Sequence, residues 1–279
     1  MLDRYGRVIN YLRISVTDRC NLRCCYCMPE GVQDVGMKNI LTFEEIWEIV
    51  RTGVSLGITH IRITGGEPLV RKGCVNLIRG IREIPGVETI TMTTNGVLLG
   101  NYAKQLKEAG VSMYHENIET SEENFPNVCT THSFEDKIHE IKRIQEAGLE
   151  LCTGGIVGMG ETWKDRLSMA FTLAELGIRS IPINILIPVK GTPFGELEPM
   201  TQEDILRTVA ILRYINPKAD VRIAAGRNYF KDGGGELFLS GVNAALTGNL
   251  LTTGGSSMEQ DRNILEEKGY ILKKKPTEK

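Results

Sequence analysis

Three cysteines near the start of the chain, Cys20, Cys24 and Cys27, follow one another at C-x3-C-x2-C spacing. The apolar, β-branched run at residues 11–17 predicts a strand just before them, so the thiols belong to a loop at the carboxyl end of that strand. Three thiolates this close together can hold three irons of a cubane iron–sulfur cluster and leave the fourth iron without a protein ligand. The spacing therefore predicts a 4Fe-4S cluster whose open iron binds and reduces a small molecule.

A structural zinc site is the competing interpretation. Such a site takes four nitrogen or sulfur ligands, usually as two separated pairs. No histidine lies near the loop, and Cys25 stands too close to its neighbours to complete a tetrahedron. Three cysteines that bind no metal are the remaining alternative.

Length and composition limit the class of protein. With 279 residues, 41% of them hydrophobic and 24% charged, the chain suits one α/β barrel or at most two smaller domains. A net charge of −2 gives no reason to expect nucleic acid or a membrane surface as partner. The sequence contains no apolar run long enough to predict a membrane span, and its first residues do not have the apolar segment of a signal peptide. Seven cysteines, three of them in one loop, argue against a secreted disulfide scaffold, so we expect a cytoplasmic protein.

Strand-like segments alternate with helical patterns along the chain. Strands are expected at residues 11–17, 60–64, 89–94, 111–118, 150–156, 180–187, 220–224 and 244–246. The first helix is predicted to begin at Thr42, which has capping-box spacing to Glu45. This pattern predicts an α/β fold, a single (β/α)8 TIM-type barrel over residues 1–279, with its chemistry at the carboxyl ends of the strands. An open sheet of about six βα units is the alternative.

The cysteine loop, with Tyr26 directly before its last cysteine, resembles the signature of the radical S-adenosylmethionine (SAM) superfamily. The resemblance implies that the open iron chelates the amino and carboxylate groups of SAM. It also implies reductive cleavage of SAM to a 5′-deoxyadenosyl radical, which takes hydrogen from an unactivated carbon. Gly65-Gly66-Glu67-Pro68, after the second strand, resembles the element whose backbone and carboxylate receive the SAM ammonium. Two glycines allow such close backbone approach, and a carboxylate suits an ammonium, although the turn alone is also that of an ordinary loop.

The first 110 residues resemble the GTP-cyclising enzymes of molybdenum-cofactor synthesis. The similar segments are residues 4–7 (RYGR), 12–21 (LRISVTDRCN) and 28–30 (MPE). Those enzymes hold a second cluster on three C-terminal cysteines. Because no cysteine follows Cys152 here, the GTP-cyclising interpretation lacks its ligands.

Residues 111–272 resemble the biotin synthase family instead. The similar segments are residues 112–121 (SMYHENIETS), 152–162 (CTGGIVGMGET), 181–184 (IPIN) with 189–193 (VKGTP), 221–227 (VRIAAGR) and 244–253. The resemblance implies radical insertion of sulfur between carbons C6 and C9 of dethiobiotin. It also implies two SAM cleavages per ring, a flavodoxin- or ferredoxin-type electron donor and a homodimer.

In that family the sulfur comes from an auxiliary cluster held by three cysteines and one arginine. Cys152 and Arg222 match two of these ligands, whereas Thr64 and either Thr91 or Met92 stand where the other cysteines belong. The family-type 2Fe-2S site therefore cannot form. We expect an auxiliary cluster of atypical ligation instead, on Cys129 and Cys152 with Cys74. The alternative for Cys74 and Cys25 is that both are small buried residues.

The same resemblance assigns the ligand contacts. Asn117 and Asn184 match asparagines that hold the ureido group of dethiobiotin, and Glu119 replaces an aspartate near the SAM ribose. His115 and His132 replace an asparagine and an arginine, and neither receives a role. The rival functions are another radical SAM reaction, as in hydrogenase maturation or methylornithine formation, and a non-enzymatic iron–sulfur carrier.

Overall fold

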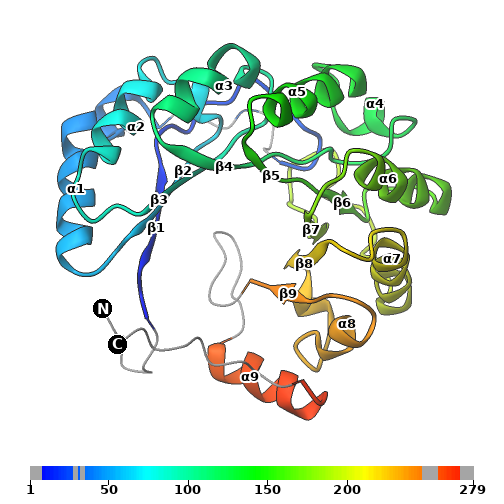
Figure 1. The fold of residues 1–279 in the computed structure, drawn as a ribbon. Coiled ribbons are helices and arrows are strands. Elements are labelled where there is room, and N and C mark those ends of the chain that lie inside the picture. Colours follow the sequence, from blue (N-terminus) through cyan, green and yellow to red (C-terminus); the bar gives the residue numbers. More distant parts are fainter. Residues whose placement is uncertain (1–7, 28–30, 32–34, 247–256, 271–279) are drawn as a thin grey trace.

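The computed structural model describes residues 8–27, 31, 35–246 and 257–270. Its strands are all parallel and follow the order β1-β2-β3-β4-β5-β7-β8-β9, with β6 paired to β7. They are β1 Tyr11–Ser15, β2 His60–Thr64, β3 Thr89–Thr93, β4 Val111–His115, β5 Glu150–Cys152, β6 Gly155–Val157, β7 Ser180–Ile185, β8 Asp220–Ala225 and β9 Ala244–Ala245. The sheet curls into an arc with helices on its outer side (Figure 1). The expected α/β, TIM-type architecture is confirmed.

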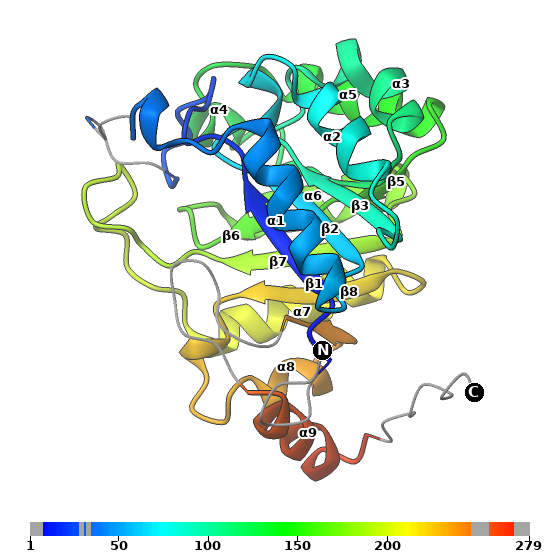
Figure 2. The same ribbon diagram turned by 90° about the vertical axis from the view of Figure 1, so that its left-hand side faces the viewer.

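Helices connect the parallel strands that neighbour each other in the sheet, as parallel crossovers require. They are α1 Phe43–Ser55, α2 Cys74–Arg82, α3 Leu99–Glu108, α4 Phe125–Val128, α5 Phe134–Glu146, α6 Trp163–Glu175, α7 Gln202–Ile215, α8 Gly235–Leu239 and α9 Met258–Glu267, with short 3-10 turns at Met37–Asn39, Pro68–Val70 and Arg227–Tyr229. Thr42 caps α1 and forms the expected capping box with Glu45. In Figure 2, α1 lies across the outer side of β1 and β2. No helix within the described ranges is long and apolar enough to cross a membrane.

Alternation along the strands separates the core from the interior of the barrel. In β2, Ile61 and Ile63 are buried against the outer helices, so Arg62 faces inward. In β8, Val221 and Ile223 pack outward in the same way, so Arg222 faces inward. The two large hydrophobic clusters therefore lie between sheet and helices, and polar side chains are left to line the inner face.

The strand expected at residues 150–156 is divided into β5 and β6 by Thr153 and Gly154. Gly154 lies so close to β7 that a Cβ atom there would be 1.7 Å from the carbonyl oxygen of Pro182. The break is therefore a consequence of tight packing between neighbouring strands, which the apolar pattern of the sequence did not reveal.

We expect Gly154→Ala to destabilise the fold by about 1–3 kcal/mol, because the added methyl overpacks a backbone junction. The matched control is Gly53→Ala within α1, where the new Cβ would meet Ile58 at 3.4 Å, an ordinary contact. Gly53→Ala should raise the free energy of unfolding by about 0.5–1 kcal/mol, because alanine has a higher helix propensity than glycine. Urea unfolding of both variants checks the pair, and equal stability of the two would contradict the packing argument.

Candidate active site

A cavity of about 320 Å³ lies on the inner side of the sheet at the carboxyl ends of the strands. It brings together most of the predicted site residues: Cys20, Cys24, Tyr26, Cys27, Gly66, Asn117, Glu119, Asn184 and Arg222. These side chains come from loops and strands more than 200 residues apart in the sequence. The curled sheet is what places them around one space.

The cysteine loop forms a tight turn at one end of this cavity. The amide of Cys27 donates to the carbonyl of Cys24 at 3.0 Å, and the side-chain amide of Asn95 lies 3.6 Å from the Cys20 sulfur. Burial raises the pKa of the Cys27 thiol to about 11, and the neighbouring Cys24 adds to this. Both effects favour the neutral thiol as long as no cation is bound. Coordination to iron would deprotonate the thiol.

The three thiols suit a cluster better than a single ion. Among the residues that the structure describes, no three His, Cys, Asp or Glu side chains converge as they would around one metal ion. A cubane differs from zinc in offering each thiolate a separate iron. All three thiols line the same cavity, so the donor set fits a 4Fe-4S cluster.

Glu67 lies at the start of the turn that follows β2. Its carboxylate is fully buried and accepts hydrogen bonds from the Thr94 hydroxyl at 2.9 Å, the Asn95 amide at 2.7 Å and the Leu69 amide at 2.9 Å. Glu67 ties the turn after β2 to the turn after β3. It is not among the residues that line the cavity, and the contact with the SAM ammonium that the sequence resemblance implies stays a prediction.

The two preceding glycines allow this turn to pack on the cysteine loop. The amides of Gly66 and Glu67 donate to the carbonyls of Thr17 and Arg19 at 2.7 and 2.8 Å. A Cβ atom on Gly66 would lie 2.4 Å from the Arg19 oxygen. Glycine is required here for close backbone approach, and Gly66 remains at the cavity wall.

Tyr26 and Glu119 join the cysteine loop to the loop after β4. The Tyr26 hydroxyl donates to the Glu119 carboxylate at 2.9 Å. Glu119 has a φ of 65° and is the one non-glycine residue within the described ranges with a positive φ. Strained backbone of this kind is typical of ligand sites. Burial raises the pKa of Glu119, whereas Lys137 and the Tyr26 hydrogen bond oppose that rise.

A buried ion pair beneath the site was not predicted. Lys137 of α5 is 2% exposed, and its Nζ lies 3.2 Å from Glu116 Oε1 and 2.5 Å from the carbonyl of Asn95. Lys137 therefore supports the same Asn95 turn that contacts Cys20 and Glu67. A signal was present in the sequence, because Lys137 lies on the apolar stripe of α5 with Ile141 and Ile144.

Cys152 and Arg222, the two residues that match family cluster ligands, lie side by side inside the barrel. Arg222 Nη1 lies 3.5 Å from the Cys152 sulfur, and Ser180 bridges both, with its Oγ 3.1 Å from that sulfur and 3.2 Å from Arg222 Nη2. Of the two candidates on β3 for a missing cysteine position, Met92 is buried in the outer core, so Thr91 is the inward residue.

The other thiols lie elsewhere. The Cys129 sulfur is 3.8 Å from Cys24, whereas Cys74 begins α2 and is buried among the apolar residues between helices and sheet. The structure thus does not bring Cys74, Cys129 and Cys152 together: Cys74 and Cys129 belong to two different hydrophobic clusters, and Cys152 contacts Ser180 and Arg222 inside the barrel. The side chain of His132 packs edge-on against Phe125 outside the main cavity.

Comparison with known proteins identifies the class. The Radical SAM superfamily matches residues 14–173, and the Biotin and Thiamin Synthesis associated domain matches residues 182–271. Methylornithine synthase shares the fold with a TM-score of 0.72 at 18% identity, covering 96% of this chain and 84% of that one. The FeFe-hydrogenase maturase of Carboxydothermus hydrogenoformans has a TM-score of 0.68 at 18% identity, covering 94% and 66%. The protein is a radical SAM enzyme.

Its relatives narrow the class further. The biotin synthase of Clostridium beijerinckii is 45% identical over 258 residues, 91% of this chain and 82% of its own. That of Alkaliphilus metalliredigens is 44% identical over 273 residues, 96% and 86%. The chain belongs to the biotin synthase family. Because 96% of it aligns, the likeness extends into the first 110 residues that resemble GTP-cyclising enzymes.

We expect Lys137→Met to destabilise the protein by about 3–5 kcal/mol near pH 8, because it leaves a buried carboxylate unpaired. Burial raises the pKa of Glu116 to about 7. Because the pKa of Glu116 is higher in the folded state than in the unfolded state, protonated Glu116 contributes to the free energy of unfolding. That contribution is complete below the unfolded-state pKa near 4.5 and is lost as pH rises through 7. The variant should therefore lose much less stability at pH 5, where Glu116 is protonated. Unfolding at both pH values, with exposed Lys142→Met as control, measures this, and a pH-independent loss would refute it.

Proposed function

We propose that the protein converts dethiobiotin to biotin by radical insertion of sulfur between C6 and C9. One observation carries the proposal: the three thiols of the cysteine loop, Asn117 and Asn184 all line one cavity in a chain of the biotin synthase family. Both carbons are saturated and not acidic, so acid–base and nucleophilic catalysis offer no route. The bound 4Fe-4S cluster and SAM would supply a carbon radical that removes these hydrogens.

The chain's own residues position these groups. Cys20, Cys24 and Cys27 would each bind one iron, and the backbone at Gly65 and Gly66 would receive the SAM ammonium. Glu119, held by the Tyr26 hydroxyl at 2.9 Å, would accept hydrogen bonds from the SAM ribose. The buried hydrogen bonds of Glu67 keep the Gly66 turn and the cysteine loop at a fixed separation.

Asn117 and Asn184 would hold the ureido group of dethiobiotin. A carboxamide both donates and accepts hydrogen bonds, which matches the N–H and C=O groups of a cyclic urea. The two residues lie at the carboxyl ends of β4 and β7, on the cavity wall. This placement would leave C6 and C9, the saturated carbons attached to the ring, free to face the cysteine loop.

The sulfur source is proposed to be an auxiliary iron–sulfur centre at Cys152 and Arg222. The residues present do not fit the family-type 2Fe-2S ligand set, because one thiol, one hydroxyl and one guanidinium meet at this point. The centre would therefore be of atypical ligation, without Cys74 or Cys129. A flavodoxin- or ferredoxin-type electron donor, a homodimer and a cytoplasmic location complete the proposal.

The direct test uses anaerobically reconstituted protein with SAM, dithionite and dethiobiotin. We expect biotin and about two 5′-deoxyadenosines per biotin, and none of either from Cys24→Ala, which removes an iron ligand. Rescue of a biotin auxotroph on dethiobiotin is the cellular counterpart. SAM cleavage without biotin would favour another radical SAM reaction, and no cleavage at all would favour an iron–sulfur carrier.

A second test concerns the sulfur source. Cys152→Ala should still cleave SAM but form no biotin, and its iron content should fall towards about four per chain. Cys74→Ala is the matched control, a buried thiol away from the cavity, and should keep the wild-type iron content. Wild-type protein with four irons, and biotin formed by Cys152→Ala, would remove the auxiliary centre from the mechanism.

A further inference from the structure

Two side chains outside the cysteine loop bring hydrogen-bond donors to its sulfur atoms. The side-chain amide nitrogen of Asn95 lies 3.6 Å from the Cys20 sulfur, and the Cys129 sulfur lies 3.8 Å from the Cys24 sulfur. Asn95 belongs to the turn after β3, whereas Cys129 directly follows α4. The two donors therefore come from different elements and reach different ligands of the expected cluster.

The orientation of the Asn95 amide is fixed by its own hydrogen bonds. Its Oδ1 accepts from the backbone amide of Val97 at 3.2 Å, so Nδ2 is the atom that faces the cysteine loop. The two hydrogens of Nδ2 have two acceptors, Asn21 Oδ1 at 2.8 Å and the Cys20 sulfur. The donor to the sulfur is thus set by the turn in which Asn95 lies.

The main chain of Asn95 is held from two sides by buried charged groups. Its amide donates to the Glu67 carboxylate at 2.7 Å, and its carbonyl accepts from Lys137 Nζ at 2.5 Å. Both charged residues are at most 2% exposed. A donor held in this way needs no rearrangement when the charge on the sulfur changes.

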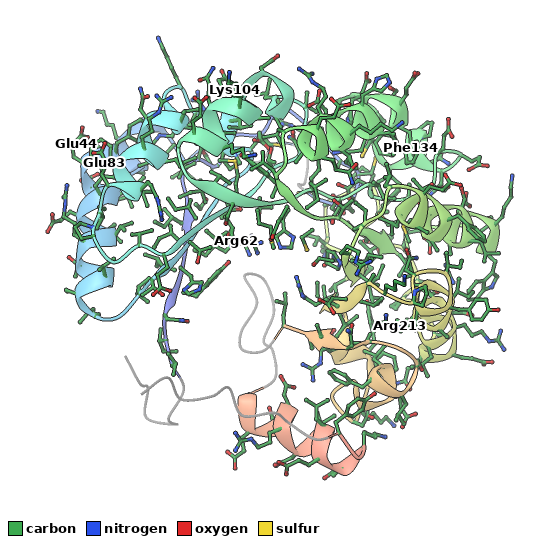
Figure 3. All side chains as sticks on the ribbon, in the orientation of Figure 1. Glu44, Arg62, Glu83, Lys104, Phe134 and Arg213 are labelled. Atoms are coloured by element: carbon green, nitrogen blue, oxygen red, sulfur yellow. The ribbon has the colours of Figure 1, made fainter. Side chains whose placement is uncertain are left out.

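Cys129 approaches the cysteine loop from the helical layer. It belongs to a hydrophobic cluster with Val128, on which Phe134 also packs, and Figure 3 shows Phe134 among the helices outside the sheet. The backbone amide of Cys25 donates to the carbonyl of Val128 at 3.1 Å and so joins the two segments. A Cys24 sulfur that is bound to iron carries no proton and can only accept, so Cys129 is the donor of this pair.

Hydrogen bonds to the ligand sulfurs are one of the means by which a protein sets the reduction potential of an iron–sulfur cluster. Reduction adds one negative charge, and a donor close to a sulfur ligand stabilises the more negative state. We propose that Asn95 and Cys129 raise the reduction potential of the 4Fe-4S cluster by donating hydrogen bonds to two of its sulfur ligands. Neither residue binds iron, and each acts through the cysteine that it contacts. This inference rests on the proposed function for the presence of the cluster.

The test is a redox titration of anaerobically reconstituted protein without SAM or dethiobiotin. Dithionite is the reductant, and the readout is the EPR signal of the reduced cluster, identified as the signal that Cys24→Ala lacks. Asn95→Ser keeps a hydroxyl that can accept from Val97 but is too short to reach Cys20. At a fixed potential it should lower the ratio of reduced to oxidised cluster about tenfold, a midpoint shift of about 59 mV for one electron. Asn76→Ser, on the outer helix α2, is the matched control and should keep the wild-type midpoint.

The second donor is tested with a pair of variants at one position. Cys129→Ala removes the donor and should lower the midpoint in the same direction as Asn95→Ser, by a smaller amount, because a thiol is a weak donor. Cys129→Ser keeps a hydroxyl that can donate, so its midpoint should lie closer to that of the wild type. A loss of packing alone would not separate these two variants in this order.

Wild-type midpoints in cluster-loaded Asn95→Ser and Cys129→Ala overturn the proposal, and so do midpoints that rise. Because the two residues belong to different elements, poor cluster loading of one variant leaves the other to decide. The titrations involve no turnover. Lowered midpoints without biotin formation by the wild type would keep this inference and refute the proposed function, whereas biotin formation with unchanged midpoints would do the reverse.

Discussion

The site depends on one buried carboxylate. Glu67 accepts hydrogen bonds from Thr94, Asn95 and Leu69 and so fixes the turn after β2 against the turn after β3. The amides of Gly66 and Glu67 then hold the cysteine loop through the carbonyls of Thr17 and Arg19. Three strand ends thereby form one rigid unit, which a cluster on three thiols requires, since its irons are held at fixed separations.

Groups of opposite charge lie at different depths of the cavity. The thiols and Glu119 lie at the strand ends, where cationic iron and the SAM ammonium would sit. Arg13, Arg62 and Arg222 lie deeper, on the strands themselves. Between the sheet and α5, Lys137 compensates Glu116 and supports Asn95 from behind.

The cysteines show how far chemistry can be assigned from residue type alone. Cys20, Cys24 and Cys27 are close in sequence, so their convergence follows from spacing. Cys74, Cys129 and Cys152 come from separate elements, and a shared cluster was inferred from residue type without geometry. In the fold, Cys74 faces the outer core, Cys129 contacts Cys24 and Cys152 faces the interior. The face of a strand or helix on which a thiol lies decides its neighbours.

The sequence by itself determined the parallel α/β architecture and the cysteine loop, since these follow from periodicity and local spacing. Asn117, Asn184, Cys152 and Arg222 were singled out by resemblance to the biotin synthase family, and the fold places Asn117, Asn184 and Arg222 on one cavity. Only the tertiary structure decided the neighbours of Glu67 and Lys137, because both depend on partners distant in the chain. The Glu67 carboxylate accepts hydrogen bonds from Thr94 and Asn95 in the turn after β3, and these partners are not apparent from the sequence around Glu67. Local sequence fixes which groups are present, whereas burial and register fix which of them meet.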